Sequence, residues 1–369
     1  MDFTFGSEQQ AVAEVAAAVL QTAASAETLA AMDRGAPVWD TTLWQRLADE
    51  GVLSLALPGS LGGDDLGIGE IGVLLGEVGR CAAQVPVLET LGFGVLPLLA
   101  LGADPQRFLS GVAGGAILTA ALAEPGAPLP AIPATAATAD GDGYVVNGRK
   151  VGVRYAEQAA FVLVPTSAGV AVVAPDADGV TLTRTFTASL APEYTMVLEN
   201  VRIDSGALLT GIPVAQVYRI ALAAVAAQAA GLGTGMTNLT AKYVTGREQF
   251  GKPIAVFQAV SQQLADSYVT ARTLELAARS ACWRLAEGLD ATEDTSVAAY
   301  WLAEQLPVSM QQCSHMHGGM GADVTYPAHL YYEQTKDLVR LVGGPASRLS
   351  ILGALSARDL GVEAACSSI

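Results

Sequence analysis

The stretch that decides the fold is Lys242–Leu285, KYVTGREQFGKPIAVFQAVSQQLADSYVTARTLELAARSACWRL. Gly251 and Pro253 interrupt a helical pattern, because glycine is costly to order and proline lacks an amide donor. Past this break, apolar residues recur every three or four positions, as on one face of a long helix: Phe257, Val260, Leu264, Tyr268, Ala271, Leu274 and Ala278. The sequence therefore predicts two long helices that meet at an exposed corner carrying Arg247 and Gln249. A helix N-terminus beside an arginine favours a phosphate or pyrophosphate.

Composition excludes some classes of partner. The chain has 369 residues, which predicts two or three domains. Hydrophobic residues make up 51% and charged residues 15%, below the usual share of about 25%. This balance favours helix-on-helix burial, including burial between subunits. The net charge of −16 argues against a nucleic acid and against an anionic membrane surface.

The cysteines and the N-terminus favour a cytoplasmic protein. Cys81, Cys282, Cys313 and Cys366 show neither a C-x-x-C pair nor metal-ligand spacing, so reduced, packed thiols are expected. The start MDFTFGSEQQ lacks the basic and apolar regions of a signal peptide. The apolar segment 220–232 is interrupted and too short for a membrane span of about 20 residues.

The period of the apolar pattern changes twice along the chain. Residues 1–115 and 209–369 follow a helical period, whereas 116–208 contain short β-rich runs typical of a small sheet or barrel. The first helix is expected to begin with Ser7 as its cap and Gln10 three residues on. The segment Pro125–Asp142, rich in alanine and proline, is expected to be a mobile loop.

The corner resembles the acyl-CoA dehydrogenase family, whose R-x-Q-F-G-x-P-I-x-x-F-Q motif matches residues 247–258 at every fixed position. The resemblance implies a mainly α, three-domain fold: an N-terminal helical domain, a small middle β domain and a C-terminal four-helix bundle. It also implies that the corner binds the FAD of a neighbouring subunit. Arg247 would reach the pyrophosphate, and the cofactor would be lined by Gln249, Phe250, Phe257 and Gln258.

A second segment, His315-Met316-His317-Gly318-Gly319-Met320-Gly321, is similar to the family's Q-x-x-G-G-x-G loop. The resemblance implies that Gly318 and Gly319 let the cofactor approach the backbone, since glycine has no Cβ. His315 replaces the usual glutamine, and an imidazole can still donate and accept a hydrogen bond. The alternative is that His315 and His317 simply pack at a helix end. No third ligand suggests a metal site.

The family's chemistry needs a carboxylate base, and this sequence has none at either position where family members carry it. Family members oxidise an acyl-CoA thioester to the α,β-enoyl-CoA, and a glutamate removes the α-proton. In one family position for this base the chain has Gly343; in the other, the helix around 216–222, it has no acidic residue. No Asp or Glu lies between Asp204 and Glu248. We therefore assign no catalytic residue.

The middle part departs from the family as well. The T-E-P-x-A-G-S-D stretch is reduced to Ala123–Pro128, the W-I-T-N strand reads Val151–Arg154, and Glu333-Gln334 replaces an arginine-aspartate pair. The sequence thus keeps residues that serve a neighbour's FAD and lacks those that hold its own flavin ring and base. This pattern resembles the base-lacking subunit of actinobacterial α2β2 acyl-CoA dehydrogenases, which act on steroid-CoA side chains.

Three hypotheses follow. The first is a subunit that shares FAD and an acyl-CoA substrate with a sister chain, with an electron-transferring flavoprotein as acceptor. The second is a self-sufficient homotetramer with a relocated base, for which Glu333 and Asp337 are the nearest carboxylates, although both are expected to face solvent or pair with Lys336 or Arg340. The third is a non-enzymatic scaffold of the same fold.

Overall fold

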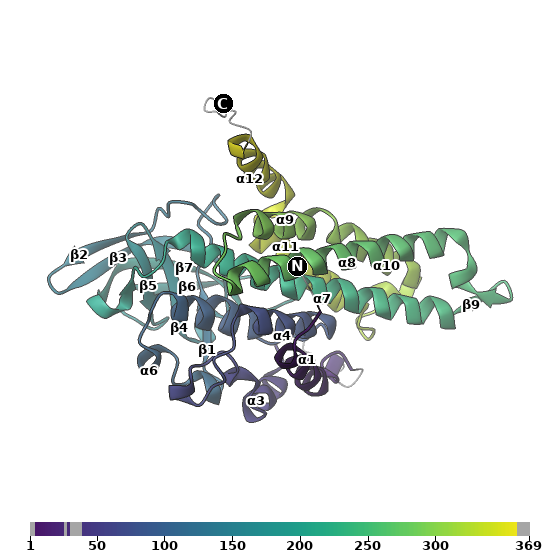
Figure 1. Cartoon of the computed structure of the whole chain (residues 1–369), viewed down its shortest axis with the longest axis horizontal. Helices are drawn as coiled ribbons and strands as arrows, with labels where there is room; N and C mark the ends of the chain where they lie inside the picture. Colours follow the sequence, from purple (N-terminus) through teal and green to yellow (C-terminus); the bar gives the residue numbers. More distant parts are fainter. Residues whose placement is uncertain (1–3, 26–27, 30–38, 360–369) are drawn as a thin grey trace.

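The computed structural model describes residues 4–25, 28–29 and 39–359. The N-terminal part is helical and lies along the lower side of the molecule in Figure 1. The first helix begins at Ser7, but Gly6 is its cap, and the Gly6 amide donates a hydrogen bond to Oε1 of Gln9 at 3.4 Å. The predicted Ser7–Gln10 cap is therefore wrong by one position. The helices here are α1 (Ser7–Leu20), α3 (Thr41–Asp49), η1 (Val52–Ser54), η2 (Gly59–Leu61), α4 (Ile68–Arg80), the π-helical η3 (Leu88–Val95), α5 (Leu96–Ala100), α6 (Pro105–Phe108) and η4 (Val112–Gly114).

The middle part contains two four-stranded sheets, seen at the left of Figure 1. In the first, with order β1-β4-β5-β8, only the β1–β4 pair is parallel. Its strands are β1 (Ile117–Ala120), β4 (Ala159–Thr166), β5 (Gly169–Val173) and β8 (Leu208–Leu209). The second sheet, with order β2-β3-β7-β6, is antiparallel. Its strands are β2 (Ala136–Asp140), β3 (Gly143–Arg154), β7 (Glu193–Asp204) and β6 (Val180–Thr185), and the short helices η5 (Ala156–Gln158) and η6 (Ser205–Ala207) lie in the connections.

The expected loop Pro125–Asp142 is not wholly irregular. Its second half forms β2, which pairs with β3 from Ala136 opposite Asn147 to Asp140 opposite Gly143. The small and polar residues of β2 gave too weak a strand signal in the sequence. The strand is largely exposed, and pairing with β3 stabilises it.

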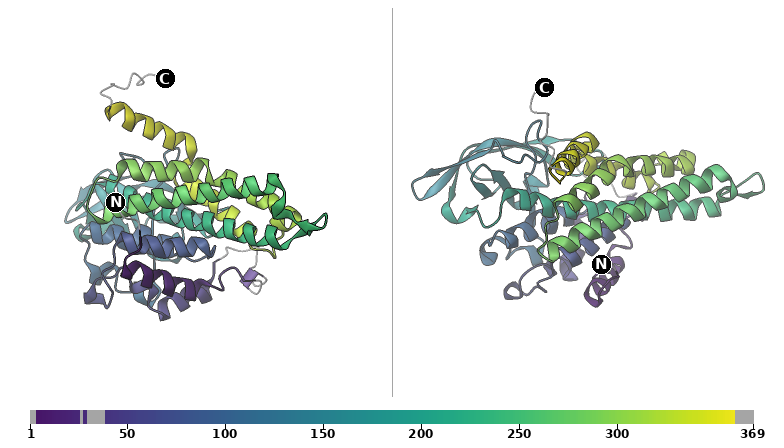
Figure 2. Two further views of the ribbon diagram at one scale, coloured as in Figure 1. Left: turned by 45° about the vertical axis from the view of Figure 1, so that its right-hand side comes forward. Right: turned by 45° about the horizontal axis from the view of Figure 1, so that its top comes forward.

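The C-terminal part is a helical bundle whose α7–α8 hairpin extends beyond the other helices (Figures 1 and 2). Helix α12 starts against α9 and then points away from the bundle. By length and composition α7 would be able to cross a membrane, but 94% of its apolar window is buried inside the protein, as in a core helix. The elements are α7 (Val214–Gly246), β9 (Glu248–Gln249), β10 (Lys252–Pro253), η7 (Ile254–Val256), α8 (Gln258–Ala286), α9 (Thr292–Glu304), α10 (Leu306–His317), η8 (Gly318–Ala322), α11 (Ala328–Leu341) and α12 (Gly344–Asp359).

The predicted order of helical, β and helical parts is therefore confirmed. The domain boundaries at residues 115 and 208 stay a prediction. The cysteines that the structure describes are free, with Cys282 and Cys313 buried and Cys81 half-buried; Cys366 lies outside the described residues.

Helix α4 crosses the central helix α7 at backbone contact. A Cβ added to Gly79 would lie 2.0 Å from the Gln228 carbonyl oxygen, and one added to Gly231 would lie 1.9 Å from the Gly76 oxygen. Real side chains never approach so closely, so only glycine allows this crossing. The crossing joins the N-terminal helices to the bundle.

Replacing Gly231 with alanine should therefore destabilise the protein. The Cβ has no room unless the two backbones separate, and such overpacking costs about 1–3 kcal/mol. The matched control is Gly353→Ala in α12, where nothing lies within 4 Å of an added Cβ. Urea unfolding followed by circular dichroism should show a lower midpoint for Gly231→Ala and an unchanged or slightly higher one for the control; equal midpoints would contradict the crossing.

Candidate functional site

The corner between α7 and α8 is a tight two-residue turn. Strands β9 and β10 pair antiparallel, with Gln249 opposite Lys252. Phe250 and Gly251 between them both have positive φ, 56° and 76°, as a type I′ turn requires. Glycine adopts this conformation freely, but for phenylalanine it costs about 1–3 kcal/mol. Phe250 is nevertheless 91% exposed, so no packing explains the strained aromatic residue at this tip.

The predicted cofactor residues of the corner gather around this turn and remain accessible. Arg247, Gln249 and Gln258 are exposed, and Phe257 is half-buried. The Phe250 and Phe257 rings meet edge to face, with centroids 6.2 Å apart. The Lys252 ammonium lies 4.7 Å from the Phe257 ring. The Arg247 guanidinium makes no hydrogen bond or ion pair with any residue that the structure describes. The Phe250 and Phe257 rings and the Arg247 guanidinium therefore lie together at this accessible corner.

The glycine turn lies at the same end of the bundle. Gly318, with φ of 59°, ends α10. A Cβ on Gly318 or on Gly319 would meet no atom within 4 Å. The chain's own packing leaves this space open, although the positive φ of Gly318 by itself favours glycine there. The open space suits the close approach of another molecule.

The two histidines before this turn differ in role. His315 is exposed, as a residue in contact with a ligand would be. His317 is only 2% exposed and stacks between Tyr243, 4.4 Å away, and Tyr326, 5.1 Å away. Its Nε2 lies 3.1 Å from the Thr240 hydroxyl. Because Thr240 and Tyr243 belong to the last turns of α7, His317 fastens the glycine turn to the corner. The packing alternative is thus correct for His317 and not for His315.

The first position expected for a base is closed. Gly343 has a φ of 85°, and a Cβ there would lie 2.5 Å from Cγ of Pro128. A glutamate would meet both the strained backbone and the proline ring. In the second position, the first turns of α7, Val217, Tyr218 and Ile220 are buried. The Tyr218 hydroxyl has no partner, and burial, reinforced by Glu124, raises its pKa, so it stays a protonated phenol.

The two segments that depart from the family lie against each other. The Val151 amide donates to the Ala123 carbonyl at 3.0 Å. A cavity of about 340 Å³ remains beside them, between the β part and the helices, and Pro128, Arg154 and Arg340 are among its lining residues.

Buried charges fill the surroundings of this cavity. Arg154 pairs with Glu89 of η3 at 3.1 Å, and both side chains are nearly inaccessible. Lys150 pairs with Glu124 at 2.8 Å. Burial alone would raise the pKa of Glu124, but hydrogen bonds from Lys150, Thr135 and the Ala134 amide outweigh it and lower the pKa to about 2. These carboxylates are engaged with the protein and are not free bases.

Helix α11 fastens this region to the second sheet. Arg340 makes a two-pronged ion pair with Glu193, with Nη1 2.9 Å from Oε1. Asp337 is buried and accepts from the Ala188 and Ser189 amides at 2.9 and 3.0 Å and from the Ser189 hydroxyl at 2.6 Å. The expectation that Asp337 faces solvent or pairs with Lys336 or Arg340 is therefore wrong, because Asp337 and Arg340 each reach across to the β part. A lone Asp and Arg at i and i+3 in an otherwise apolar helix face were the only sequence signal.

No group of three or more His, Cys, Asp or Glu side chains within the described ranges is arranged to hold a metal ion.

The chain shares its sequence and fold with acyl-CoA dehydrogenases. Residues 6–116 match the family description "Acyl-CoA dehydrogenase, N-terminal domain" and residues 214–348 match "Acyl-CoA dehydrogenase, C-terminal domain". Acyl-CoA dehydrogenase FadE28 of Mycobacterium tuberculosis is 48% identical over 96% of this chain and 98% of its own. The chain belongs to the acyl-CoA dehydrogenase family. The predicted fold is confirmed, and the chain is identified as one of the FAD-dependent acyl-CoA dehydrogenases.

Solved structures of heteromeric relatives are similar over the whole chain. A variant of the Tcur3481-Tcur3483 steroid ACAD has a TM-score of 0.89 and 33% identity and covers 97% of this chain and 100% of its own. The ChsE4-ChsE5 complex from Mycobacterium tuberculosis has a TM-score of 0.87 and 31% identity, with 99% and 100% covered. The match to butyryl-CoA dehydrogenase from Megasphaera elsdenii, at 20% identity and a TM-score of 0.86, shows the shared fold.

The corner and the glycine turn of this acyl-CoA dehydrogenase present accessible residues that suit FAD at one end of the bundle. The open glycines at 318 and 319 and the outward corner leave room for a dinucleotide. Near Gly343 the Pro128 ring lies where a side chain of residue 343 would be, and Arg154, paired with Glu89, lines the cavity that remains beside it. FAD supplies the acceptor for the substrate's hydride when it is bound.

Alanine substitutions at two adjacent glycines test the closed position. Gly344 has a φ of 76° but open space around an added Cβ, so Gly344→Ala should cost only the left-handed backbone penalty of about 1–2 kcal/mol. Gly343→Ala should cost about 1–3 kcal/mol more, because it also meets Pro128. Adding Pro128→Gly should remove that excess in a double-mutant cycle of unfolding free energies; additive effects would contradict the contact.

Burial of His317 should make stability depend on pH. Burial lowers the pKa of His317 from 6.5 to about 4, so the unfolded chain takes up a proton first as the pH falls. The free energy of unfolding should fall by up to about 3 kcal/mol as the pH drops from about 6.5 to 4. His317→Gln, which does not titrate, should flatten this part of the profile, measured by urea unfolding between pH 7.5 and 4.5. A parallel profile would show that another group titrates.

Proposed function

We propose that this chain is the base-lacking subunit of a heteromeric acyl-CoA dehydrogenase. It contributes FAD contacts from its corner and glycine turn, while a sister chain supplies the glutamate that removes the α-proton. The reaction is the α,β-dehydrogenation of an acyl-CoA thioester in the cytoplasm, with an electron-transferring flavoprotein as acceptor.

One contrast carries the proposal. The dinucleotide-facing end of the chain is open, whereas its own base position is closed by Pro128 against Gly343. A chain that acted alone would need both. The relocated-base alternative loses one of its two candidates. The Asp337 carboxylate accepts three hydrogen bonds from residues 188 and 189, and Asp337 is not among the residues that line the cavity.

Within the shared site, we assign this chain a binding role. The Arg247 guanidinium would form charge-assisted hydrogen bonds with the pyrophosphate, and Phe250 and Phe257 would lie against the cofactor beside Gln249 and Gln258. His315 would replace the hydrogen bonds of the family's glutamine, and the backbone of Gly318 and Gly319 would allow close approach. His317 keeps the two cofactor-facing segments together.

Exposed apolar side chains on the outer helices support association with another chain. Tyr268 and Val269 of α8 are each 58% exposed. Further large apolar side chains are exposed on neighbouring helices, and surfaces of this kind mark protein–protein contacts: Leu276 of α8, Val297 of α9, Val308 of α10, and Leu349 and Ile351 of α12.

The similar solved structures favour a bulky substrate. The Tcur3481-Tcur3483 enzyme is described as a steroid ACAD, and ChsE4-ChsE5 is described as a complex. By this similarity we propose an α2β2 assembly that acts on a steroid side-chain thioester.

The test is to purify this chain alone and together with a sister chain that carries the glutamate. We expect flavin absorbance and dehydrogenation only in the co-purified complex. Arg247→Ala in this chain should weaken FAD binding to the complex by about 10- to 100-fold, the loss expected for a charge-assisted hydrogen bond of about 1.5–3 kcal/mol.

The matched control is Arg202→Ala on β7, which removes an exposed pair with Asp140 and should leave the flavin content unchanged. A yellow, active preparation of this chain alone would refute the proposal and favour the homotetramer. A complex without flavin would favour the scaffold.

A further inference from the structure

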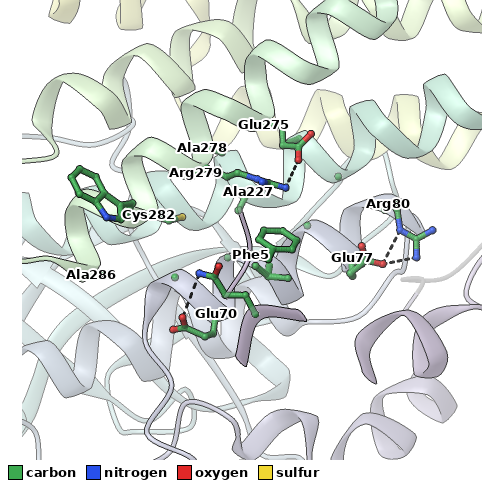
Figure 3. Close-up of a pocket in the computed structure, with 18 of the residues that line it drawn as sticks. Phe5, Glu70, Glu77, Arg80, Ala227, Glu275, Ala278, Arg279, Cys282 and Ala286 are labelled. Atoms are coloured by element: carbon green, nitrogen blue, oxygen red, sulfur yellow. Dashed lines mark hydrogen bonds and ion pairs between the residues drawn. The ribbon is translucent and has the colours of Figure 1, made fainter. Parts of the chain in front are cut away.

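A second cavity, of about 320 Å³, lies on another side of the bundle. Its floor is formed by small residues of α4, α7 and α8, and Phe5 covers it from the segment before α1 (Figure 3). It shares no lining residue with the cavity beside Arg154. Its size lies within the range of small-molecule pockets, about 300–1,000 Å³.

The glycines of α4 that line this cavity are not all needed for packing. Gly79, which does not line the cavity, allows the crossing with α7, whereas a Cβ on the lining residue Gly76 would lie 3.9 Å from the Ala227 oxygen, an ordinary contact. Glycine inside a helix is destabilising relative to alanine. Gly76 and Ala227 both line the cavity, so the missing Cβ at residue 76 widens the cavity at the expense of helix stability.

The charges around the cavity do not cancel. Arg80 pairs with Glu77, and Arg279 pairs with Glu275, as Figure 3 shows. Two further carboxylates line the cavity, those of Glu70 and Glu287. Glu70 accepts a 3.4 Å hydrogen bond from the neutral Gln9 amide, and neither carboxylate forms an ion pair with a residue of the described ranges. The lining set therefore has an excess of negative charge.

Aromatic rings in the cavity wall offer faces that attract cations. The Arg279 guanidinium already lies 4.2 Å from the centre of the Phe5 ring, so this wall accepts a cation on its π face. Trp283 also lines the cavity, one helical turn before Glu287. Indole is the aromatic side chain that attracts cations most strongly.

We propose that this cavity binds a hydrophobic organic cation, an aryl- or alkylammonium compound. Its apolar body would lie on the glycine and alanine floor, and its charged group would lie near Trp283, Glu70 and Glu287. The excess of carboxylates would repel an anionic thioester, so this is not a second acyl-CoA site. The inference is independent of the proposed subunit role.

Covalent binding is not part of the proposal. Cys282 lines the floor, but burial, helped by the nearby Glu70 carboxylate, raises the pKa of its thiol to about 12. The thiol is therefore not a nucleophile at neutral pH.

Three benzyl compounds test the ligand class: cationic benzyltrimethylammonium, neutral benzyl alcohol and anionic phenylacetate. Calorimetric titration uses the full-length protein, alone or in complex with its sister chain. The cation should bind at least about tenfold more tightly than either analogue and raise Tm. Neither the calorimetric affinity nor the Tm depends on flavin, so failure of this test can be distinguished from failure of the proposed subunit role.

Variants then locate the site. Gly76→Ala should raise the Tm of the ligand-free protein and weaken binding of the cation at least about tenfold. Gly353→Ala, a helical glycine with open surroundings in α12, should leave binding unchanged. Glu70→Gln combined with Glu287→Gln should abolish the preference for the cation while leaving benzyl alcohol binding as it was.

Each opposite result overturns the proposal: no binding of the cation, equal binding of the three probes, or wild-type affinity in Gly76→Ala or in the double glutamine variant.

Discussion

The contact between Pro128 and Gly343 limits what this cleft can hold. A side chain at residue 343 and the proline ring cannot occupy the same space, since an added Cβ would lie 2.5 Å from Cγ. The Glu124–Pro128 segment is in turn held by Lys150 and by the Ala123–Val151 backbone bond. Several segments therefore close the position where the family has its catalytic glutamate, so more has changed than the loss of that one residue.

The ion pairs around the cleft join the β part of the chain to the helices. Glu89 with Arg154 links η3 to β3, and Glu193 with Arg340 links β7 to α11. Only the Glu89–Arg154 pair is buried on both sides, since the Arg340 side chain is 48% exposed. Buried pairs add little net stability over apolar packing, because desolvation offsets their attraction. Breaking one pair is still costly, about 3–5 kcal/mol, since a lone charge stays buried. They therefore fix the arrangement of the β part against the helices more than they strengthen the fold.

The sequence predicted the parts of this structure that depend on local pattern or on a contiguous motif. The change of period located the helical and β parts, and the spacing from Arg247 to Gln258 located the corner, because helix breaks and apolar stripes are local properties. The roles of Asp337 and Arg340 were missed, since their partners lie about 150 residues away at residues 188 to 193. The Pro128–Gly343 contact was unpredictable for the same reason. Gly343 indicated from the sequence that this position holds no base. Only the folded structure shows that Pro128 lies where a side chain of residue 343 would be. The two rings around His317 come from α7 and from the turn before α11, as Tyr243 and Tyr326. No spacing in the sequence predicts this contact.

Helix α7 separates the altered cleft at its first turns from the corner at its last turns, so that one can change without the other. It has 33 residues, about 50 Å at 1.5 Å per residue. Tyr218 lies in its first turns beside the altered cleft, whereas Thr240 and Tyr243 support the glycine turn at its last. The middle of the helix is buried and crosses α4 at backbone contact. Its last turns extend with α8 beyond the other helices (Figure 1), so its two ends have different neighbours. Changes that close the cleft at the first end therefore leave the geometry of the corner untouched. Both features are compatible within one stable chain because the helix keeps them apart.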